Sequence, residues 1–199
     1  MSGVLLEVRN LGKAFDAVPA LTDVSFDVER SATLGVVGES GSGKTTLARC
    51  ILRAVAPDSG TVRYASDAGW VNLHELREKA LIPLRREIQM MFQDPYGSLN
   101  PRMTVRQILE EPLIIHRRGN AKARLNAVVE MLQRVHLEPD VMSRYPHAFS
   151  GGQRQRISIA RSLILRPRLV VCDEAVSGLD VSVRAQIINL LQDLQAELV

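Results

Sequence analysis

The octapeptide GESGSGKT, residues 38–45, has the composition and spacing of a loop that binds phosphate. It matches the pattern Gly, four residues, Gly, Lys and then Ser or Thr, in which glycines let backbone N–H groups close around phosphate oxygens. We expect Lys44 to reach the outer phosphates of a nucleotide and Thr45 to hold Mg²⁺. A chance glycine-rich loop is the alternative, and the apolar run before it and the helical pattern after it favour the phosphate site. The residues assigned to nucleotide binding in this stretch are Gly38, Glu39, Ser40, Gly41, Ser42, Gly43, Lys44, Thr45 and Thr46.

The segment LVVCDE, residues 169–174, is an apolar run that ends on two carboxylates. In a nucleotide hydrolase the first, Asp173, belongs to the shell around Mg²⁺, and the second, Glu174, is placed to polarise the attacking water. Alone, an acidic pair after a strand is usually a turn. Together with the phosphate loop it is interpreted as catalytic, with Glu174 and Lys44 as candidate catalytic residues.

The segment FSGGQRQR, residues 149–156, begins a helix with an unusual composition. Ser150 and Gln153 have the spacing of a capping box, so a plain helix start is one interpretation. Gly151 and Gly152 would each weaken the helix by about 1 kcal/mol, which a cap alone does not require. Bare backbone N–H groups at a helix N-terminus are suited to phosphate. The chain therefore carries a second element that favours phosphate, although one nucleotide would fill the first.

The hydrophobic pattern places these motifs on alternating strands and helices. The first thirty residues alternate like half-buried strands, and residues 33–38 (TLGVVG) form a short apolar run typical of a strand buried on both faces. A helix should begin at Gly43 and end at the turn residues PDSG, 57–60. Residues 88–92 and 169–172 are expected to be buried strands, and helices are expected at 104–116, at 121–135, from about Ser150, and at the chain's end.

This order of elements predicts an α/β fold with a mostly parallel sheet. The helical block at approximately 94–165 looks inserted into that core, and 199 residues fit one domain with such an inserted subdomain. The final helix carries an apolar face at three- and four-residue spacing, and a further strand is expected after it, because a crossover helix connects two parallel strands.

Composition excludes several classes of protein. Charged residues make up 24% and hydrophobic residues 46%, as in ordinary globular chains, and a net charge of +3 is too small to indicate nucleic acid. Six arginines lie in the acid-free stretch between Asp140 and Asp173, where a solvated helix face and an anion-facing surface are both open interpretations. Cys50 and Cys172 are expected to be reduced thiols of a cytoplasmic protein. No apolar run approaches the roughly 20 residues that cross a bilayer, and the start lacks the pattern of a signal peptide.

Five motifs in order resemble those of the ABC ATPase family. GESGSGKT is similar to its Walker A loop, Gln93 to its Q-loop glutamine, FSGGQ to its signature, LVVCDE to its Walker B strand, and SGLD at 177–180 to its D-loop. The resemblance covers essentially the whole chain. It implies a P-loop NTPase with a RecA-like core sheet, an N-terminal antiparallel β subdomain and the inserted helical subdomain, in a single nucleotide-binding domain spanning residues 1–199 and lacking its C-terminal part.

The resemblance also implies roles for residues and partners. Phe15 matches the aromatic side chain that stacks on adenine, although a core phenylalanine would give the same pattern. Gln93 would sense Mg²⁺ and the γ-phosphate, as a catalytic residue and metal ligand. In the family two such domains pair head to tail, so Asp180 would cross the interface. The signature residues that would act on the ATP of the partner are Ser150, Gly151, Gly152 and Gln153.

A narrower resemblance concerns the importer branch for oligopeptides, dipeptides and nickel. Residues 89–105 and 144–156 are similar to that branch, and the segments lie where the family meets its membrane permease. This implies an ATP-hydrolysing subunit of a bacterial importer on the cytoplasmic face of the inner membrane. Its partners would be a second ATP-binding subunit, integral-membrane permease subunits and, indirectly, an external solute-binding protein, with no nucleic acid. Phe149, Ala148, Ala175 and Gly178 depart from the usual motifs without removing a catalytic group.

The family also has a switch histidine on a strand after the final helix, and the sequence ends before it. That strand would lie between residues 33–37 and 169–172, so we expect these two strands to be separated by a gap of roughly 9 to 10 Å. We also expect the 199-residue chain to hydrolyse ATP poorly. Two alternatives stay open: a soluble ABC ATPase with no permease, and an ATP-binding but hydrolysis-deficient fragment.

Overall fold

The computed structural model describes residues 3–91, 95–173 and 180–198. The chain divides into two compact units, residues 1–85 and 86–199, which are described separately. Helix α2 (Glu78–Glu87) spans the boundary between them. Gln93, Glu174 and the first three residues of the SGLD motif lie outside the described residues.

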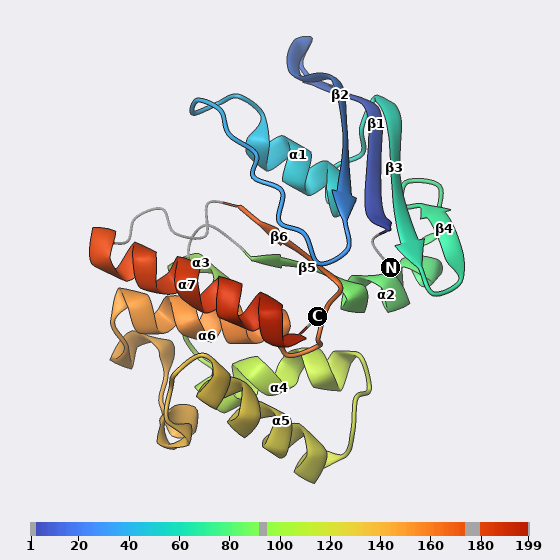
Figure 1. Ribbon diagram of the computed structural model, residues 1–199. Coiled ribbons are helices and arrows are strands. Elements are labelled where there is room, and N and C mark those ends of the chain that lie inside the picture. Colours follow the sequence, from blue (N-terminus) through green and yellow to red (C-terminus); the bar gives the residue numbers. More distant parts are fainter. Residues whose placement is uncertain (1–2, 92–94, 174–179, 199) are drawn as a thin grey trace. The chain divides into compact units, whose positions relative to one another are not determined.

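The first unit is built on an antiparallel sheet (Figure 1). Its strands are β1 (Val4–Phe15), β2 (Val18–Glu29), β3 (Ser59–Ser66) and β4 (Gly69–Asn72), in the order β2-β1-β3-β4. Leu6 and Val8 of β1 are buried, as are Val62 and Tyr64 opposite them on β3. The alternation seen in the sequence therefore buries one face of this sheet, which confirms the expected half-buried strands.

A two-residue turn connects β1 to β2. Phe15 pairs with Val18, and the intervening Asp16 and Ala17 have φ values of 46° and 67°. Positive φ at both central residues is the geometry of a type I′ hairpin turn, whose twist suits the strands on either side. Asp tolerates this conformation, whereas Ala in the left-handed region is strained.

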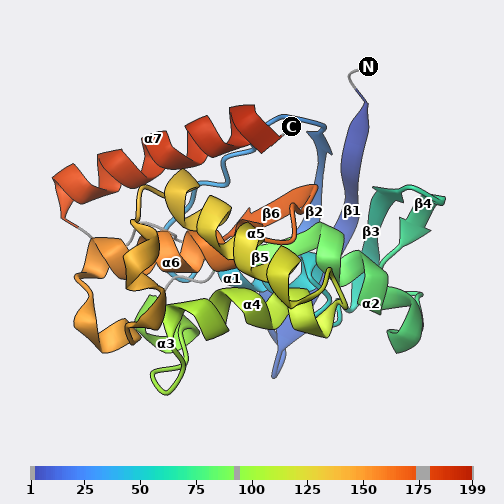
Figure 2. The ribbon, with the colours of Figure 1, turned by 90° about the horizontal axis from the view of Figure 1, so that it is seen from below.

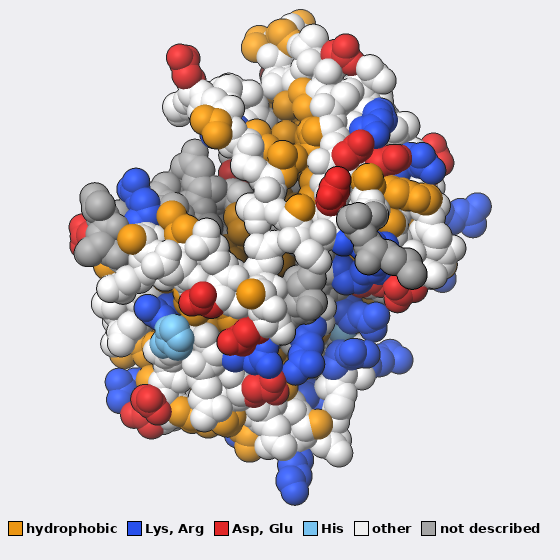
Figure 3. All heavy atoms as spheres, viewed as in Figure 1, with side chains coloured by type: hydrophobic (Ala, Val, Ile, Leu, Met, Phe, Trp, Pro, Cys, Tyr) orange, Lys and Arg blue, Asp and Glu red, His pale blue; other side chains and the backbone are white. Residues whose placement is uncertain are grey.

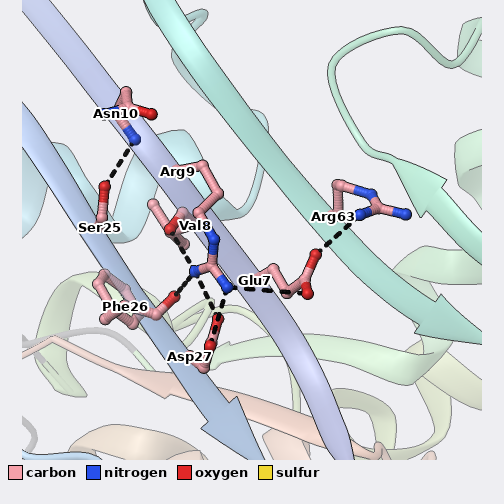
Figure 4. A network of polar contacts seen from close by, with 8 residues as sticks. All are labelled: Glu7, Val8, Arg9, Asn10, Ser25, Phe26, Asp27 and Arg63. Atoms are coloured by element: carbon pink, nitrogen blue, oxygen red, sulfur yellow. Dashed lines mark hydrogen bonds and ion pairs between the residues drawn. The ribbon is translucent and has the colours of Figure 1, made fainter.

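Charged side chains of three strands form a network on this sheet (Figure 4). Glu7 of β1 lies directly opposite Asp27 of β2, a like-charge pair that would destabilise the sheet. Arg9 offsets this repulsion: its guanidinium donates to Asp27 at 2.8 Å and to the Phe26 carbonyl oxygen at 3.1 Å, and lies 3.7 Å from Glu7. Arg63 of β3 donates to Glu7 at 2.9 Å. In the space-filling view, acidic and basic side chains are interspersed over this sheet (Figure 3).

The second unit combines a two-stranded parallel sheet with helices (Figure 2). Strand β5 (Ile88–Met91) pairs in parallel with β6 (Leu169–Cys172). The helices are α3 (Pro95–Ser98), α4 (Val105–Ile115), α5 (Ala121–Arg134), α6 (Gly151–Leu163) and α7 (Val181–Leu198), with 3-10 turns η1 (Pro139–Ser143) and η2 (Pro146–Ala148).

Side-chain caps explain where three of these helices begin. Thr104 accepts from the Gln107 amide at 3.3 Å and forms a capping box with that residue at the start of α4. Asn120 accepts from the Ala123 amide at 2.9 Å at the start of α5. The third cap, Ser150, belongs to the candidate site. Each such cap contributes on the order of 1 kcal/mol.

One hydrophobic core holds the second unit together. It contains Met91 of β5, side chains from α4, α5 and α6, and Ile187, Leu190 and Leu194 of α7. The last three lie at the three- and four-residue spacing seen in the sequence, so the apolar face of the final helix is confirmed. This face packs within a core shared mainly with other helices rather than against a broad sheet.

The arginine-rich stretch forms mostly ion pairs. Arginines 144, 161, 166 and 168 lie within 3.4 Å of carboxylates of Asp140, Glu111, Glu130 and Glu87 respectively. Arg156 donates to the Val135 carbonyl oxygen at 2.9 Å. These contacts favour the solvated-face interpretation of the stretch over an anion-facing surface.

The expected strand at residues 33–38 is wrong. These residues are irregular and exposed, with Val37 96% exposed. In the sheets formed by the described residues no strand pairs with this segment. A parallel strand buried on both faces needs neighbours at both edges, so the apolar run alone does not form one. We expected a gap between a strand at 33–37 and the strand at 169–172. Because residues 33–37 form no strand, this expected spacing between strands is not tested. Strand β6 is also less buried than expected, because Cys172 is exposed.

In the described part of the chain, no helix is both long and apolar enough to cross a membrane.

We predict that Ala17→Gly stabilises the first unit by about 0.5–1 kcal/mol, because glycine relieves the strain of positive φ and loses only part of that gain to chain entropy. Urea unfolding checks it. Ala68→Gly is the matched control: Ala68 lies in the turn between β3 and β4 without positive φ, so glycine there should destabilise. Equal effects of both substitutions would contradict the strain at Ala17.

Candidate nucleotide-binding site

The phosphate loop leads directly into helix α1 (Lys44–Ile51) in the first unit. Gly41 and Gly43 have φ values of 82° and 91°, a region that side chains rarely adopt, and Gly43 is the N-cap of the helix. The Ser42 amide donates to the Glu39 carbonyl oxygen at 3.2 Å, which closes the loop. A tight glycine turn before a helix N-terminus is the backbone geometry expected of a phosphate site.

The Lys44 ammonium is held over this loop. It donates to the carbonyl oxygens of Gly38 at 2.8 Å and Glu39 at 2.6 Å, and lies 3.5 Å from the Ser42 hydroxyl oxygen. These short contacts come from the loop itself, so the positive charge is centred on the same turn as the backbone N–H groups. The Lys44 ammonium and the N-terminus of α1 therefore attract an anion to the same position.

Gly43 is required for a second reason. A Cβ atom there would lie far inside van der Waals contact with the carbonyl oxygen of Ala20 on β2. The N-terminal end of α1 therefore packs directly on the hairpin of β1 and β2.

The opposite end of α1 is capped by a histidine. The imidazole Nε2 of His74 lies 2.8 Å from the carbonyl oxygen of Cys50, to which it can donate. Burial lowers the pKa of His74 below its usual value, and the nearby Arg53 adds to this, while the contact with Cys50 opposes it. Cys50 is buried in this helix and is a free thiol.

Phe15 lies at the end of β1 and its side chain is 48% exposed. The interpretation of Phe15 as a core residue is therefore excluded. The Lys13 ammonium lies 5.4 Å from the centre of the Phe15 ring, within range of a cation–π contact. An exposed aromatic ring in the unit that carries the phosphate loop could stack on a base.

The Walker B segment belongs to the second unit. Asp173 follows β6, is 8% exposed, and its amide donates to the Met91 carbonyl oxygen at 3.0 Å. A carboxylate and a hydroxyl such as that of Thr45 are hard oxygen donors, which suit Mg²⁺. The candidate catalytic residue Glu174 and the candidate ligand Gln93 lie outside the described residues.

The signature residues start α6 as the sequence indicates. Ser150 accepts from the Gln153 amide at 3.3 Å, and the Gln153 side chain accepts from the Ser150 amide at 3.1 Å. Gly152 has a packing role that sequence reasoning missed, because a Cβ there would lie 2.9 Å from Val183 of α7. Asp180 lies exposed just before α7, and its carbonyl oxygen accepts from the Arg184 amide.

Phe15, the phosphate loop, Lys44 and Thr45 belong to the first unit, and Asp173, the signature residues and Asp180 belong to the second. Sequence reasoning missed Lys13 of β1 and its partner Asp58, which also accepts from the Ala14 amide of that strand. The one available signal was the PDSG segment, which was interpreted only as a turn.

The family model for ABC transporter matches residues 21–177. The chain belongs to the ABC transporter family.

Curated relatives carry names from peptide transport. The chain is 53% identical over 199 residues to YkfD of Bacillus subtilis, whose name describes an oligopeptide transport ATP-binding protein; the match covers 97% of this chain and 59% of that protein. It is 45% identical to the oligopeptide transport ATP-binding protein OppF of the same organism, covering 99% of this chain and 65% of OppF. The chain thus spans about 60% of the length of such relatives.

Solved ABC structures share the fold. The cassette MJ0796, solved as a dimer bound to ADP and Pi, has a TM-score of 0.83 and 29% identity, covering 97% of this chain and 84% of that one. CbiO1 of Clostridium perfringens, part of the complex cbiONQ, has a TM-score of 0.85 and 26% identity, covering 98% of this chain and 75% of that one. These neighbours confirm the expected P-loop NTPase fold class.

We predict that Gly43→Ala destabilises the chain far more than Gly41→Ala. Both substitutions meet positive φ, which costs about 1–2 kcal/mol, but nothing lies within 4 Å of a Cβ at Gly41. Only Gly43→Ala forces the loop away from Ala20. Denaturant unfolding of both variants checks this, and equal losses would contradict the close approach.

A second prediction concerns pH. Because the pKa of His74 is lowered in the folded state, its contribution to stability is present above the unfolded value near 6.5 and is lost as pH falls. His116, whose pKa is lowered by burial and by Arg86 and Arg118, acts in the same direction. Unfolding free energies measured between pH 8 and pH 5 should decrease toward acid, and less steeply for His74→Gln. An unchanged slope in that variant would contradict the burial of a neutral imidazole.

Proposed function

We propose that this chain binds Mg²⁺–ATP and hydrolyses it to energise a bacterial membrane importer for peptides or a related small solute. The observation that carries the proposal is the phosphate loop, in which left-handed glycines, a helix N-terminus and the Lys44 ammonium converge on one turn. The names of the relatives support the choice of transport and of peptides.

In this proposal the first unit binds the nucleotide. Backbone N–H groups of residues 38–46 enclose its phosphates, and Lys44 exchanges its contacts with the loop carbonyls for the outer phosphates. The exposed ring of Phe15 stacks on adenine. Thr45, Gln93 and Asp173 would hold Mg²⁺, which when bound neutralises charge on the phosphates.

The second unit supplies hydrolysis and pairing. Glu174 polarises the attacking water, and Gln93 links the nucleotide to the helical subdomain at approximately 94–165. Ser150, Gly151, Gly152 and Gln153 act on the ATP of a second ATP-binding subunit, and the position of these residues at the N-terminus of α6 supports this role. Asp180 is exposed where it would meet that subunit.

The partners of the proposal are a second ATP-binding subunit and integral-membrane permease subunits, with an external solute-binding protein acting indirectly. The chain would then lie on the cytoplasmic face of the bacterial inner membrane as a peripheral subunit. The dimeric state of the solved cassette MJ0796 supports pairing. Poor hydrolysis by the 199-residue chain stays a prediction.

We predict that Lys44→Ala weakens ATP binding at least tenfold, because it removes the charge that reaches the outer phosphates. Fluorescence titration with a labelled ATP in Mg²⁺ measures this. Lys79→Ala, which removes an exposed lysine of α2, is the matched control and should bind normally. Glu174→Gln should retain ATP and lose turnover.

A separate experiment tests the proposed role in transport. ATP hydrolysis by the full complex in permease-containing vesicles should rise with solute-binding protein and fall to background in Glu174→Gln. Binding of ATP without association with any permease would instead support a soluble ABC ATPase. Binding without turnover in any assembly would support a hydrolysis-deficient fragment.

A further inference from the structure

Asp58 holds the end of strand β1 with three separate contacts. Its carboxylate accepts from the Lys13 ammonium at 2.8 Å and from the Ala14 amide at 2.7 Å. Its own amide donates to the Gly12 carbonyl oxygen at 2.8 Å. Three consecutive residues of β1 are thus bound by one residue, and the next residue along the strand is Phe15.

The Phe15 ring is oriented by the same cluster. Lys13 is bound to Asp58 and its ammonium lies 5.4 Å from the ring centre. With a cation over one face of the ring, a planar ligand is limited to the other face. The Lys13 side chain is only 16% exposed, so this cation is largely fixed, whereas the Phe15 residue is exposed to solvent.

Asp58 also connects this strand to the helix that carries the phosphate loop. It lies in the turn that follows α1, and the opposite end of α1 packs at Gly43 against Ala20 of the same hairpin. The hairpin is therefore held by Gly43 at the start of α1 and by Asp58 in the segment between α1 and β3. Contacts on both sides of the Phe15 end of the hairpin restrict its movement relative to the loop, as a ligand with a base at one end and phosphates at the other requires.

We propose that Asp58 is a positioning residue for the adenine end of the site: through Lys13 and the Ala14 amide it presents one face of Phe15 to the purine ring. This inference rests on the proposed function, because it assumes that ATP binds here. The bonds from Lys13 and then from Ala14 hold the pKa of the Asp58 carboxyl below its usual value, so the contacts persist at neutral pH.

The test separates the base from the phosphates. Dissociation constants for ATP and for inorganic tripolyphosphate, which has no base, are measured by calorimetry on the full chain in Mg²⁺. Asp58→Ala should weaken ATP binding roughly threefold to tenfold, and Phe15→Ala should weaken it about tenfold, as expected for loss of base stacking. Neither substitution should change the dissociation constant for tripolyphosphate. Lys13→Met, which keeps most of the side-chain length but removes the charge, should resemble Asp58→Ala.

Two controls support the interpretation. Glu29→Ala removes an exposed carboxylate from the same unit away from this cluster, and should change neither constant. In the double variant Asp58→Ala and Phe15→Ala, ATP affinity should be no lower than in Phe15→Ala alone, because Asp58 acts through the ring.

The outcomes are distinct. Equal weakening of ATP and tripolyphosphate in Asp58→Ala would mean general damage to the fold, and would overturn the proposal. So would an unchanged ATP constant in Asp58→Ala when Phe15→Ala is impaired. If the unmodified chain binds neither ligand, the proposed function fails first, and the role of Asp58 fails with it.

Discussion

The close approach of the Gly43 backbone to the Ala20 carbonyl oxygen is the constraint on which the first unit depends. It sets the phosphate loop against the β1–β2 hairpin and leaves no room for a side chain. Helix α1 has only eight residues, too few to be stable alone, so its position depends on its buried face and on contacts at its ends. At its C-terminal end the imidazole of His74 contacts the Cys50 carbonyl oxygen.

In the second unit, one larger hydrophobic core positions the candidate site residues. Helices α6 and α7 and strand β6 all contribute side chains to this core, so the segments that begin or end at them are positioned by the same packing. The arginines around them are mainly bound to carboxylates, which removes a large positive field from that surface. If an anion binds there as proposed, backbone amides rather than these arginines would recognise it.

Sequence alone predicted much of this. Motif spacing located the phosphate loop, and the capping box of Ser150 and Gln153 is present as its spacing indicated. The prediction of a strand at residues 33–38 was wrong because an apolar run indicates only a preference for burial, whereas a strand also needs a neighbouring strand as hydrogen-bond partner. Asp58 and Lys13 were missed because they are 45 positions apart in the sequence, and no local pattern reveals such a pair. The exposure of Phe15 likewise depends on tertiary packing, since a core phenylalanine has the same local sequence.

The position of Val183, which occupies the space that a Cβ at Gly152 would need, has a consequence for variation in this fold. The two positions share a fixed volume: one helix start is empty of side chain because the neighbouring helix fills the space with a branched one. A side chain at 152 would force Val183 to shift, so substitutions at the two positions are expected to be coupled. An exchange of a whole signature segment between related cassettes should therefore be tolerated better when the facing residue of α7 is exchanged with it.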